Sequence, residues 1–215
     1  MTEIAIYVEG GGDMTHQKAE LRQGLDGLLD EVKSKARAKR FGWKLVCAGG
    51  RQKAYDAFIN ALRTNGDAIN VLLVDSESPI AAETGDSARD ARERVAHLTA
   101  RDGWDFAAAP AERIHLMVQC MEAWIVADAE ALAKYYGRGF ARKVLPARPN
   151  LEDEPKQSVS DKLDRATRKT QKGEYKKIRH AKQILERIDA TKVAQRCPRF
   201  ATFTRWLTES IEGAR

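Results

Sequence analysis

Four short apolar segments, separated by segments of helical periodicity, constrain the fold of this chain most strongly. They cover residues 4–8, 43–47, 69–75 and 113–119. The third segment, INVLLVD, is apolar on both faces, as a central strand of a parallel sheet should be. Strands that alternate with helical crossovers predict an α/β fold, in which helices flank a mainly parallel, four-stranded sheet.

The apolar residues between and after these strands recur at helical spacing. Residues 138–175 include prolines 146, 149 and 155, so we expect a mobile excursion there. We predict an α/β domain over residues 1–137 and a helical extension over residues 138–215 that packs on the same domain. The expected helices cover residues 16–38, 55 to about 65, 88–100, 121–135, 158–170, 178–188 and 198–211.

Composition narrows the class of protein. Hydrophobic residues make up 43% of the 215 residues, which suits a globular chain with a sizeable core. No apolar run approaches the roughly 18 residues of a membrane span. The N-terminus also lacks a basic segment before a cleavage site, so we expect a cytoplasmic protein without a membrane partner. Cys47, Cys120 and Cys197 lie far apart, which predicts buried, reduced thiols.

The positive charge is concentrated in the last third of the chain. Residues 1–150 carry 21 basic and 21 acidic side chains, whereas residues 151–215 carry 16 and 10, so the net charge of +6 lies entirely in the second range. A localised basic surface is typical of proteins that bind phosphates. A solvated helical face without a partner would give the same pattern, and charge alone does not separate the two.

Carboxylates end two of the four predicted strands. Glu9 follows the first strand, and Asp75 and Glu77 end the third in the sequence DSE. Ligands bind at the carboxyl ends of parallel strands, and adjacent strands lie about 4.8 Å apart, so Glu9 is expected to face the other two acids. Close carboxylates repel one another, and Mg²⁺ or Mn²⁺ would resolve the conflict. Acids that only cap neighbouring helices are the alternative, but the three together favour a metal.

Three glycines and an aspartate follow Glu9. Gly10 to Gly12 allow positive φ angles and a tight turn into the next helix, and their bare amides would also let a phosphate approach. The sequence GGGD satisfies neither the Walker pattern nor GxGxxG. We predict that Asp13 caps the helix, with an outer metal ligand as the alternative.

Basic and acidic residues elsewhere near this sheet edge are further candidates. Arg51 could fork onto a phosphate and Lys53 could add a point charge, although a glycine turn with solvated basic residues is the alternative. Glu122 begins the helix after the fourth strand, where a catalytic or metal role competes with a simple helix-dipole role. His115 is expected to pack within its strand, and Trp124 within the core.

The segment YKKIRHA adds a second basic group. Lys176 and His180 are four residues apart and would share one helical face. Lys177 falls within the apolar stripe of the predicted helix, so either the helix starts after it or its side chain points inward toward a site.

The strand-end acids resemble those of the Toprim domain, the catalytic module of topoisomerases, bacterial primases, recombination-repair proteins and overcoming-lysogenization-defect nucleases. That module has a glutamate at the end of its first strand, in a glycine-containing turn, and an Asp-x-Asp pair after a later strand. Glu9 matches the first element, and Asp75 and Glu77 match the second, with Glu in place of the usual second Asp. The exchange retains the charge and lengthens the reach, which puts the number of metals in doubt.

Longer segments, in order along nearly the whole chain, are similar to a small bacterial Toprim-like family. Its members are often encoded beside ATPases of the ABC or structural-maintenance type, and are suspected phage-defence effectors. The segments are YVEGGGD, CAGGRQKAY, LLVDSES, HLMVQCMEAWIVAD, YKKIRHAKQIL and RCPRFATFTRWL.

This resemblance implies a Toprim-like (Rossmann-like) fold and a Mg²⁺- or Mn²⁺-dependent nuclease that a partner ATPase controls. Glu9, Asp75 and Glu77 would hold the metal and, with Glu122, form the catalytic set. DNA or RNA would be held by Arg51, Lys53, Lys176, Lys177 and His180. The segment YKKIRHA recurs in this family, which implies that it folds back over the carboxylates and binds phosphate. Nothing in the chain resembles the nucleophilic tyrosine region of a topoisomerase, so strand passage is not expected. The main alternative is a non-catalytic module of the same fold that binds nucleic acid or a partner; a weaker one is a nucleotide-binding regulator that uses the glycine turn.

Overall fold

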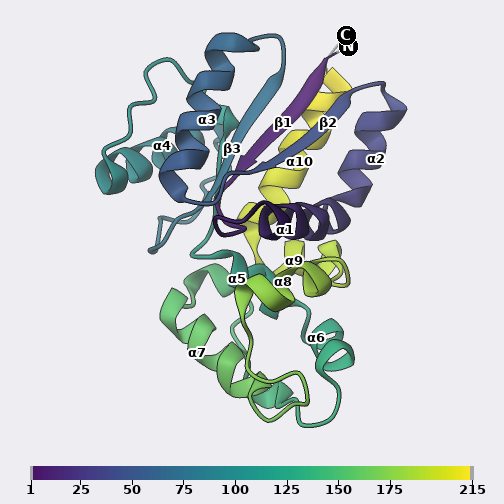
Figure 1. Cartoon of the computed structure of the whole chain (residues 1–215). Coiled ribbons are helices and arrows are strands. Elements are labelled where there is room, and N and C mark those ends of the chain that lie inside the picture. The colour runs from purple at the N-terminus through teal and green to yellow at the C-terminus, as the bar shows by residue number, and fades with distance from the viewer. Residues whose placement is uncertain (1, 214–215) are drawn as a thin grey trace.

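The computed structural model describes residues 2–213. Its central sheet consists of β1 (Glu3–Val8), β2 (Gly42–Cys47), β3 (Ile69–Asp75) and β4 (Ile114–Met117). All three pairs of neighbouring strands are parallel, in the order β2-β1-β3-β4 (Figure 1). The predicted α/β fold is confirmed, and the sheet is entirely rather than mainly parallel.

The strand order reverses beside β1. The chain runs from β1 to β2 on one side and then crosses to β3 on the other, so that Val8 pairs with Cys47 of β2 and with Leu73 of β3. Open α/β sheets bind ligands outside the carboxyl ends of the strands, at the point where the strand order reverses. A ligand site is therefore expected where β1 and β3 end.

Helices cover both faces of this sheet and continue below it (Figure 1). They are α1 (Thr15–Leu28), α2 (Asp30–Ala38), α3 (Arg51–Thr64), α4 (Ser87–Asp102), α5 (Met121–Ala127), α6 (Ala129–Tyr136), α7 (Lys156–Thr167), α8 (Lys177–Leu185), α9 (Ala190–Arg196) and α10 (Pro198–Gly213). Short 3-10 turns lie at Ala111–Arg113, Arg142–Val144 and Leu151–Asp153.

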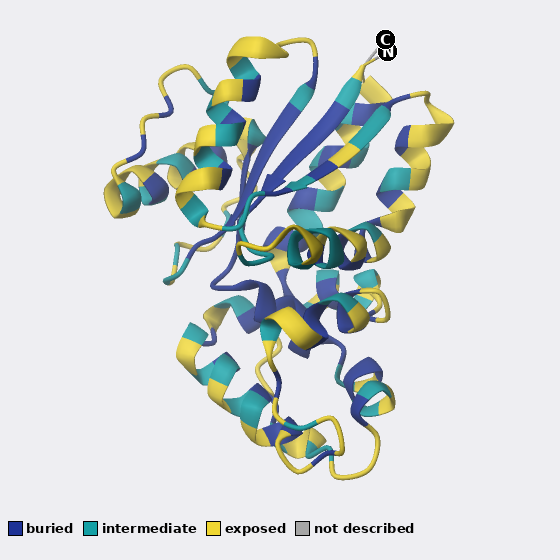
Figure 2. Ribbon diagram, viewed as in Figure 1, coloured by how far each residue is buried: buried dark blue, intermediate teal, exposed yellow. Residues whose placement is uncertain are grey.

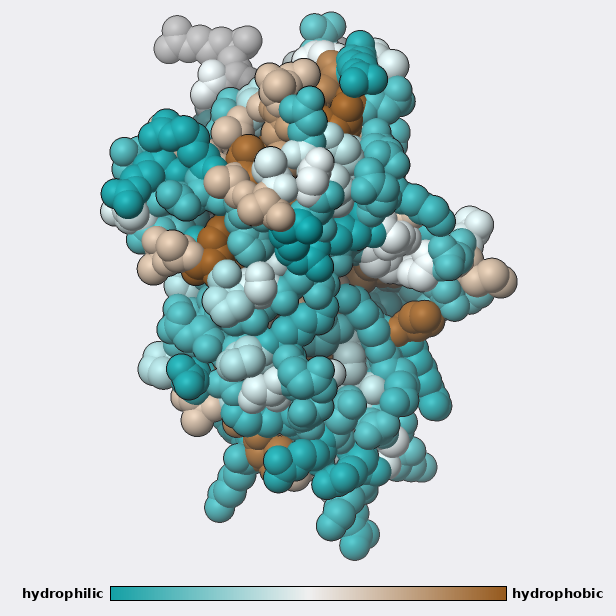
Figure 3. Space-filling view, turned by 90° about the vertical axis from the view of Figure 1, so that its left-hand side faces the viewer, coloured by the Kyte–Doolittle hydropathy of each residue, from teal (hydrophilic) through white to brown (hydrophobic). Residues whose placement is uncertain are grey.

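The two helical layers bury opposite faces of the strands. Phe58 of α3 and Leu98 of α4 pack on one face, whereas Leu25 of α1 and Phe203 of α10 pack on the other. Because the central strands are covered on both sides, their sequences are apolar without alternation. The outer side of the α3 and α4 layer is mostly hydrophilic with small, separate apolar patches, so these helices shield the sheet from solvent (Figure 3).

The core continues without interruption from the sheet into the lower helices. Trp124 of α5 is fully buried, as expected, and α5 forms the buried centre between the sheet and the helices below it (Figure 2). Leu151 and Leu163, from the segment that we expected to be a mobile excursion, belong to the same hydrophobic core as the strands. Residues 138–213 thus pack on the α/β layer, and α10 returns to cover the sheet.

Local differences from the expected elements have identifiable causes. The predicted helix 16–38 is two helices, because Leu29 has φ −98° and ψ 16° and bends the chain while its side chain stays in the core. His115 is buried between Phe203 and Trp206, as predicted. The helical spacing of Ile178, Ala181 and Ile184 predicts that all three side chains are buried. That prediction is wrong for Ile178, whose side chain is 51% exposed.

Cys47, Cys120 and Cys197 are buried thiols. Within residues 2–213, the helices all fall short of the length and apolar content that a bilayer span requires.

Asp128 divides the predicted helix 121–135 into α5 and α6. Its Oδ1 caps α6 by accepting hydrogen bonds from the N–H groups of Glu130 (3.2 Å) and Ala131 (3.1 Å). Its Oδ2 accepts a hydrogen bond from the N–H of Asp189 at 3.1 Å, and Lys192 Nζ lies 3.1 Å from Oδ1. One buried carboxylate therefore ends one helix, starts the next and joins both to the start of α9.

We expect Asp128→Ala to lower the free energy of unfolding by about 1.5 kcal/mol, because loss of a helix cap and of a buried acceptor both destabilise. The melting temperature, followed by circular dichroism, should fall by about 3–6 °C. Asp128→Asn retains an oxygen that can cap α6 and should cost less. Equal losses for the two variants would contradict the capping role.

Candidate metal and nucleic-acid site

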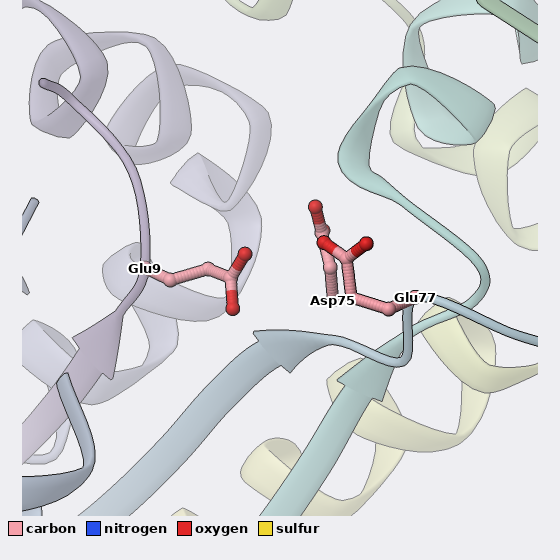
Figure 4. Close-up of side chains that lie close together, drawn as sticks. All are labelled: Glu9, Asp75 and Glu77. Carbon is pink, nitrogen blue, oxygen red and sulfur yellow. The ribbon is translucent and has the colours of Figure 1, made fainter. Parts of the chain in front are cut away.

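The carboxylates of Glu9, Asp75 and Glu77 converge where β1 and β3 end. Each offers one oxygen, and these oxygens all lie within 4.8 Å of one another. Glu9 extends from the end of β1 toward Asp75 and Glu77, which come from the end of β3 (Figure 4). The predicted convergence of the three acids is confirmed, at the reversal of strand order that favours a ligand site.

The glycine turn places Glu9 by turning the chain sharply from β1 into α1. Gly10, Gly11 and Gly12 have φ angles of +111°, +88° and +63°, in the region that side chains rarely adopt. A Cβ atom on Gly11 would also lie 2.9 Å from the Cα of Lys18. The predicted positive φ angles are confirmed, and the conformation of the turn by itself requires the glycines.

The residue after these glycines does not cap the helix. The N-cap residue of α1 is Met14, so the predicted capping role of Asp13 is wrong. The Asp13 carboxylate instead lies 3.2 Å from Lys53 Nζ, and both side chains are largely exposed. Lys53 is therefore an exposed side chain with one acidic partner, and its contact with nucleic acid stays a prediction.

Glu77 reaches the cluster through an unusual backbone conformation. It has φ +66°, which is uncommon for a residue with a side chain, and residues in such strained conformations cluster at functional sites. Its N–H donates a hydrogen bond to the Gln119 carbonyl at 2.9 Å, which ties it to the end of β4. The strand ends at Asp75, so this turn, rather than a continued strand, brings Glu77 back toward Asp75.

Asp75 is the most deeply buried of the three acids, at 1% exposed. Its Oδ1 accepts a hydrogen bond from the Met121 N–H at 2.9 Å, at the start of α5. Burial raises the pKa of Asp75 to about 7, although the Lys177 ammonium favours the charged form. Burial also raises the pKa of Glu9. Buried carboxylates that resist ionisation, with oxygen as the sole donor type, fit a hard cation such as Mg²⁺ or Mn²⁺.

Arg51 is positioned at the site by acidic partners. Its guanidinium lies 2.8 Å from Glu9 Oε2 and makes a two-pronged contact with Asp102, at 3.0 and 2.7 Å. It also donates a hydrogen bond to the Asp75 carbonyl and lies 5.0 Å from the centre of the Trp104 ring. These contacts give Arg51 a role in orienting Glu9, and its contact with a phosphate stays a prediction.

Lys177 is the first residue of α8, and its side chain points toward the carboxylates, which confirms the inward direction. Its Nζ lies 3.6 Å from Glu122 Oε1 and 3.9 Å from Asp75 Oδ2. Burial lowers the pKa of Lys177, but the carboxylates of Asp75, Glu122 and Glu9 raise it more, so this lysine stays charged. Glu122 is nearly buried and accepts a hydrogen bond from the Tyr175 hydroxyl at 3.2 Å.

The two other candidates of the basic segment lie away from the acids. His180 is 2% exposed, and its Nδ1 accepts a hydrogen bond from the Lys176 N–H at 3.1 Å and lies 3.3 Å from the Tyr136 hydroxyl. The expected position of His180 at the phosphate site is therefore wrong. The ring packs inside the fold and stabilises the start of α8 through its hydrogen bond with Lys176. Lys176 is exposed and contacts Glu174 at 2.7 Å.

Three residues that the sequence analysis did not select complete the site. Asp102, at the end of α4, holds Arg51, and Lys156, at the start of α7, lies 2.5 Å from Glu77 Oε1. The third is Tyr175, beside Glu122. Asp102 and Lys156 have no local sequence signal, because tertiary contacts alone bring them here. Tyr175 could have been found, because it opens the segment YKKIRHA.

Comparison with known proteins gives one match. A family model described as a domain of unknown function (DUF4276) matches residues 8–208, a range that includes every residue of the site. No curated protein and no solved structure matches the chain. Since the match extends over most of the sequence, this chain belongs to the DUF4276 family.

Proposed function

We propose that this protein is a Toprim-type nuclease that uses Mg²⁺ or Mn²⁺ to cleave phosphodiester bonds in DNA or RNA. The observation that carries the proposal is the convergence of Glu9, Asp75 and Glu77 within 4.8 Å at the reversal of strand order. The same three residues match the acidic elements of the Toprim domain. The raised pKa of Asp75 means that its charged form destabilises the metal-free fold. Such perturbed groups are typical of functional sites.

In this mechanism Glu9, Asp75 and Glu77 would hold the metal ion. When bound, the ion polarises a phosphoryl oxygen and lowers the pKa of water. Arg51 orients Glu9 through the contacts described above. Lys177, charged and beside Asp75, offers its ammonium group to a phosphate oxygen. Glu122 contacts Lys177 and keeps it in place. As a carboxylate outside the metal set, Glu122 would be free to accept a proton during cleavage.

The resemblance to Toprim-like proteins also suggests a cellular setting. We propose a cytoplasmic phage-defence effector whose cleavage a partner ATPase of the ABC or structural-maintenance type controls. Three cations of the protein itself are compatible with restraint in the absence of a partner, because Arg51, Lys156 and Lys177 each contact an acid of the cluster. A polyanion that attracts these lysines would leave the acids available to the metal.

The same three contacts favour a second candidate, a non-catalytic module that binds nucleic acid or a partner. In that case the cations neutralise the acids permanently, and the carboxylates hold the lysines in place rather than a metal. Such a module would bind nucleic acid equally well with and without Mn²⁺, whereas the nuclease needs the metal for turnover.

The decisive experiment is cleavage of plasmid DNA and total RNA with Mg²⁺ or Mn²⁺. We expect cleavage by the wild type, and loss of at least roughly 100-fold in Glu9→Gln and Asp75→Asn, since each removes a metal ligand. Glu31→Gln is the matched control, because Glu31 is an exposed carboxylate on α2. Metal-independent binding without cleavage, in the presence or absence of the ATPase, would favour the non-catalytic module.

A further inference from the structure

A small cavity lies between the glycine turn, the start of α1 and α8. Its volume is about 280 Å³, close to the lower end of the range for small-molecule sites, about 300 Å³. The backbone of Gly10 to Gly12 forms one wall, and Leu21, Ile178 and Ala181 form the apolar remainder. Gln17 and Glu20 supply a polar edge, and Lys177 and Lys182 supply positive charge.

The exposure of Ile178 points to a ligand for this cavity. Within residues 2–213, the exposed large apolar side chains are Met14 and Ile178, and both lie close to the glycine turn. A Cβ atom on Gly12 would lie 3.5 Å from Ile178 Cδ1, so Ile178 stands directly against the turn. The rest of its helical stripe, including Ala181 and Ile184, is buried. Ile178 alone turns away from the core, toward the cavity.

The cavity is joined to the carboxylate cluster by shared residues. Gly10, which lines the cavity, directly follows Glu9 in the chain. Lys177 lines the cavity as well, and its ammonium lies beside Asp75 and Glu122. A ligand whose phosphate contacts Lys177 could therefore place an attached flat, largely apolar group in the cavity.

We propose that the cavity receives one unpaired nucleobase of the substrate, next to the phosphate that is cleaved. This inference rests on the proposed nuclease function and names its substrate class as single-stranded or locally unpaired nucleic acid. Apolar side chains stack on the faces of an extruded base, and a few polar groups bind its edge. Ile178 and Leu21 are suited to the first task, and Gln17 to the second. A base inside a duplex is covered by its neighbours and would first have to be unpaired and unstacked, at a cost in free energy.

Binding to oligonucleotides tests the proposal without requiring cleavage. Fluorescence anisotropy would compare single strands of DNA and of RNA with a matched duplex and with a strand that carries phosphates and sugars but no bases. Ca²⁺ would replace Mg²⁺ to prevent turnover. We expect binding to weaken by about tenfold when the bases are absent, within the range for stacking of one base. Ile178→Ser should weaken binding of the normal strand by a similar factor and leave binding of the baseless strand unchanged.

Met14→Ser is the matched control, because Met14 is similarly exposed (58%, against 51% for Ile178) but does not line the cavity. Equal affinity for strands with and without bases, or equal effects of the two serine variants, would overturn the inference. The proposed function is judged separately by cleavage. If the protein binds the normal strand more tightly than the baseless strand but cleaves nothing, the nuclease proposal is rejected and the base site is kept. If it cleaves duplex rapidly and binds the two strands equally, the base site is rejected and the nuclease proposal is kept.

Discussion

Replacement of Asp75 by asparagine should raise the stability of the metal-free protein and remove its stabilisation by Mn²⁺. Asparagine has nearly the same shape and can still accept the hydrogen bond from the Met121 N–H. It removes a carboxyl group whose burial raises its pKa to about 7. The change therefore relieves a cost of folding and deletes a metal ligand at the same time.

The pH dependence of this effect has a definite sign. Because the pKa of Asp75 is higher in the folded protein than its ordinary value of 3.8, the folded state binds the proton more tightly than the unfolded state does. The wild type loses stability from this group as the pH rises from about 4 to about 7. Asp75→Asn does not undergo that loss, so its advantage in melting temperature should be near zero at pH 4 and reach its full value above pH 7.

Addition of metal should stabilise the wild type and not the variant, and so narrow the difference between the two proteins. At a free Mn²⁺ concentration of about 100 times the dissociation constant, the wild type gains about 2.7 kcal/mol and Asp75→Asn gains nothing. A melting series with and without Mn²⁺ at pH 8 measures both effects. An equal rise in melting temperature for wild type and variant would contradict a metal site at Asp75.

Asp90→Asn provides a control of opposite sign. Asp90 is also buried, but it accepts hydrogen bonds from Thr84 and Gly85, which lower its pKa in spite of the burial. Loss of the charge there should destabilise the protein at neutral pH, and the loss should shrink as the pH falls toward 3. Stabilisation of both variants would indicate a general effect of charge removal rather than a property of the site.

Replacement of Gly24 by leucine should destabilise the protein by about 2–3 kcal/mol and reduce cleavage. Helices α1 and α8 touch at this point, where a Cβ atom would lie 2.9 Å from the Cα of Lys182 and 3.1 Å from the Cβ of Leu185. Overpacking of a core costs about 1–3 kcal/mol, occasionally more, and because the obstacle here is backbone we expect a gross cost of about 3–4 kcal/mol. The gain in helix propensity, about 1 kcal/mol, offsets part of that cost.

The effect on cleavage follows from the position of Lys177 at the start of α8. A side chain at Gly24 pushes α8 away from α1, and with it the ammonium that lies beside Asp75 and Glu122. Gln23→Leu, one residue earlier on the exposed side of α1, is the matched control and should change the melting temperature little. A melting temperature of Gly24→Leu within 1 °C of the control, where about 4–12 °C is expected, would show that the helices do not need this close contact.

The sequence by itself determined the layers of the fold and the acids of the site. Two-sided apolar strands such as Ile69–Asp75 require helices on both faces, and an acid at the end of such a strand lies at the ligand-binding edge. The turn after Glu9 was predictable for the same kind of reason, because positive φ angles in succession require glycines. These features depend on backbone conformation and burial within one chain segment, so the sequence of that segment is enough to predict them.

The tertiary structure decided what surrounds those acids. Strand order, which places β1 between β2 and β3, arises from packing of the whole sheet, and it sets Glu9 opposite Asp75. Asp102 and Lys156 come from helices far along the chain, and no local pattern marks them. Ile178 was expected to be buried and is exposed, whereas His180 was expected at the phosphate site and is buried. Which face of α8 is buried depends on its contact with α1, and periodicity within one helix does not contain that information.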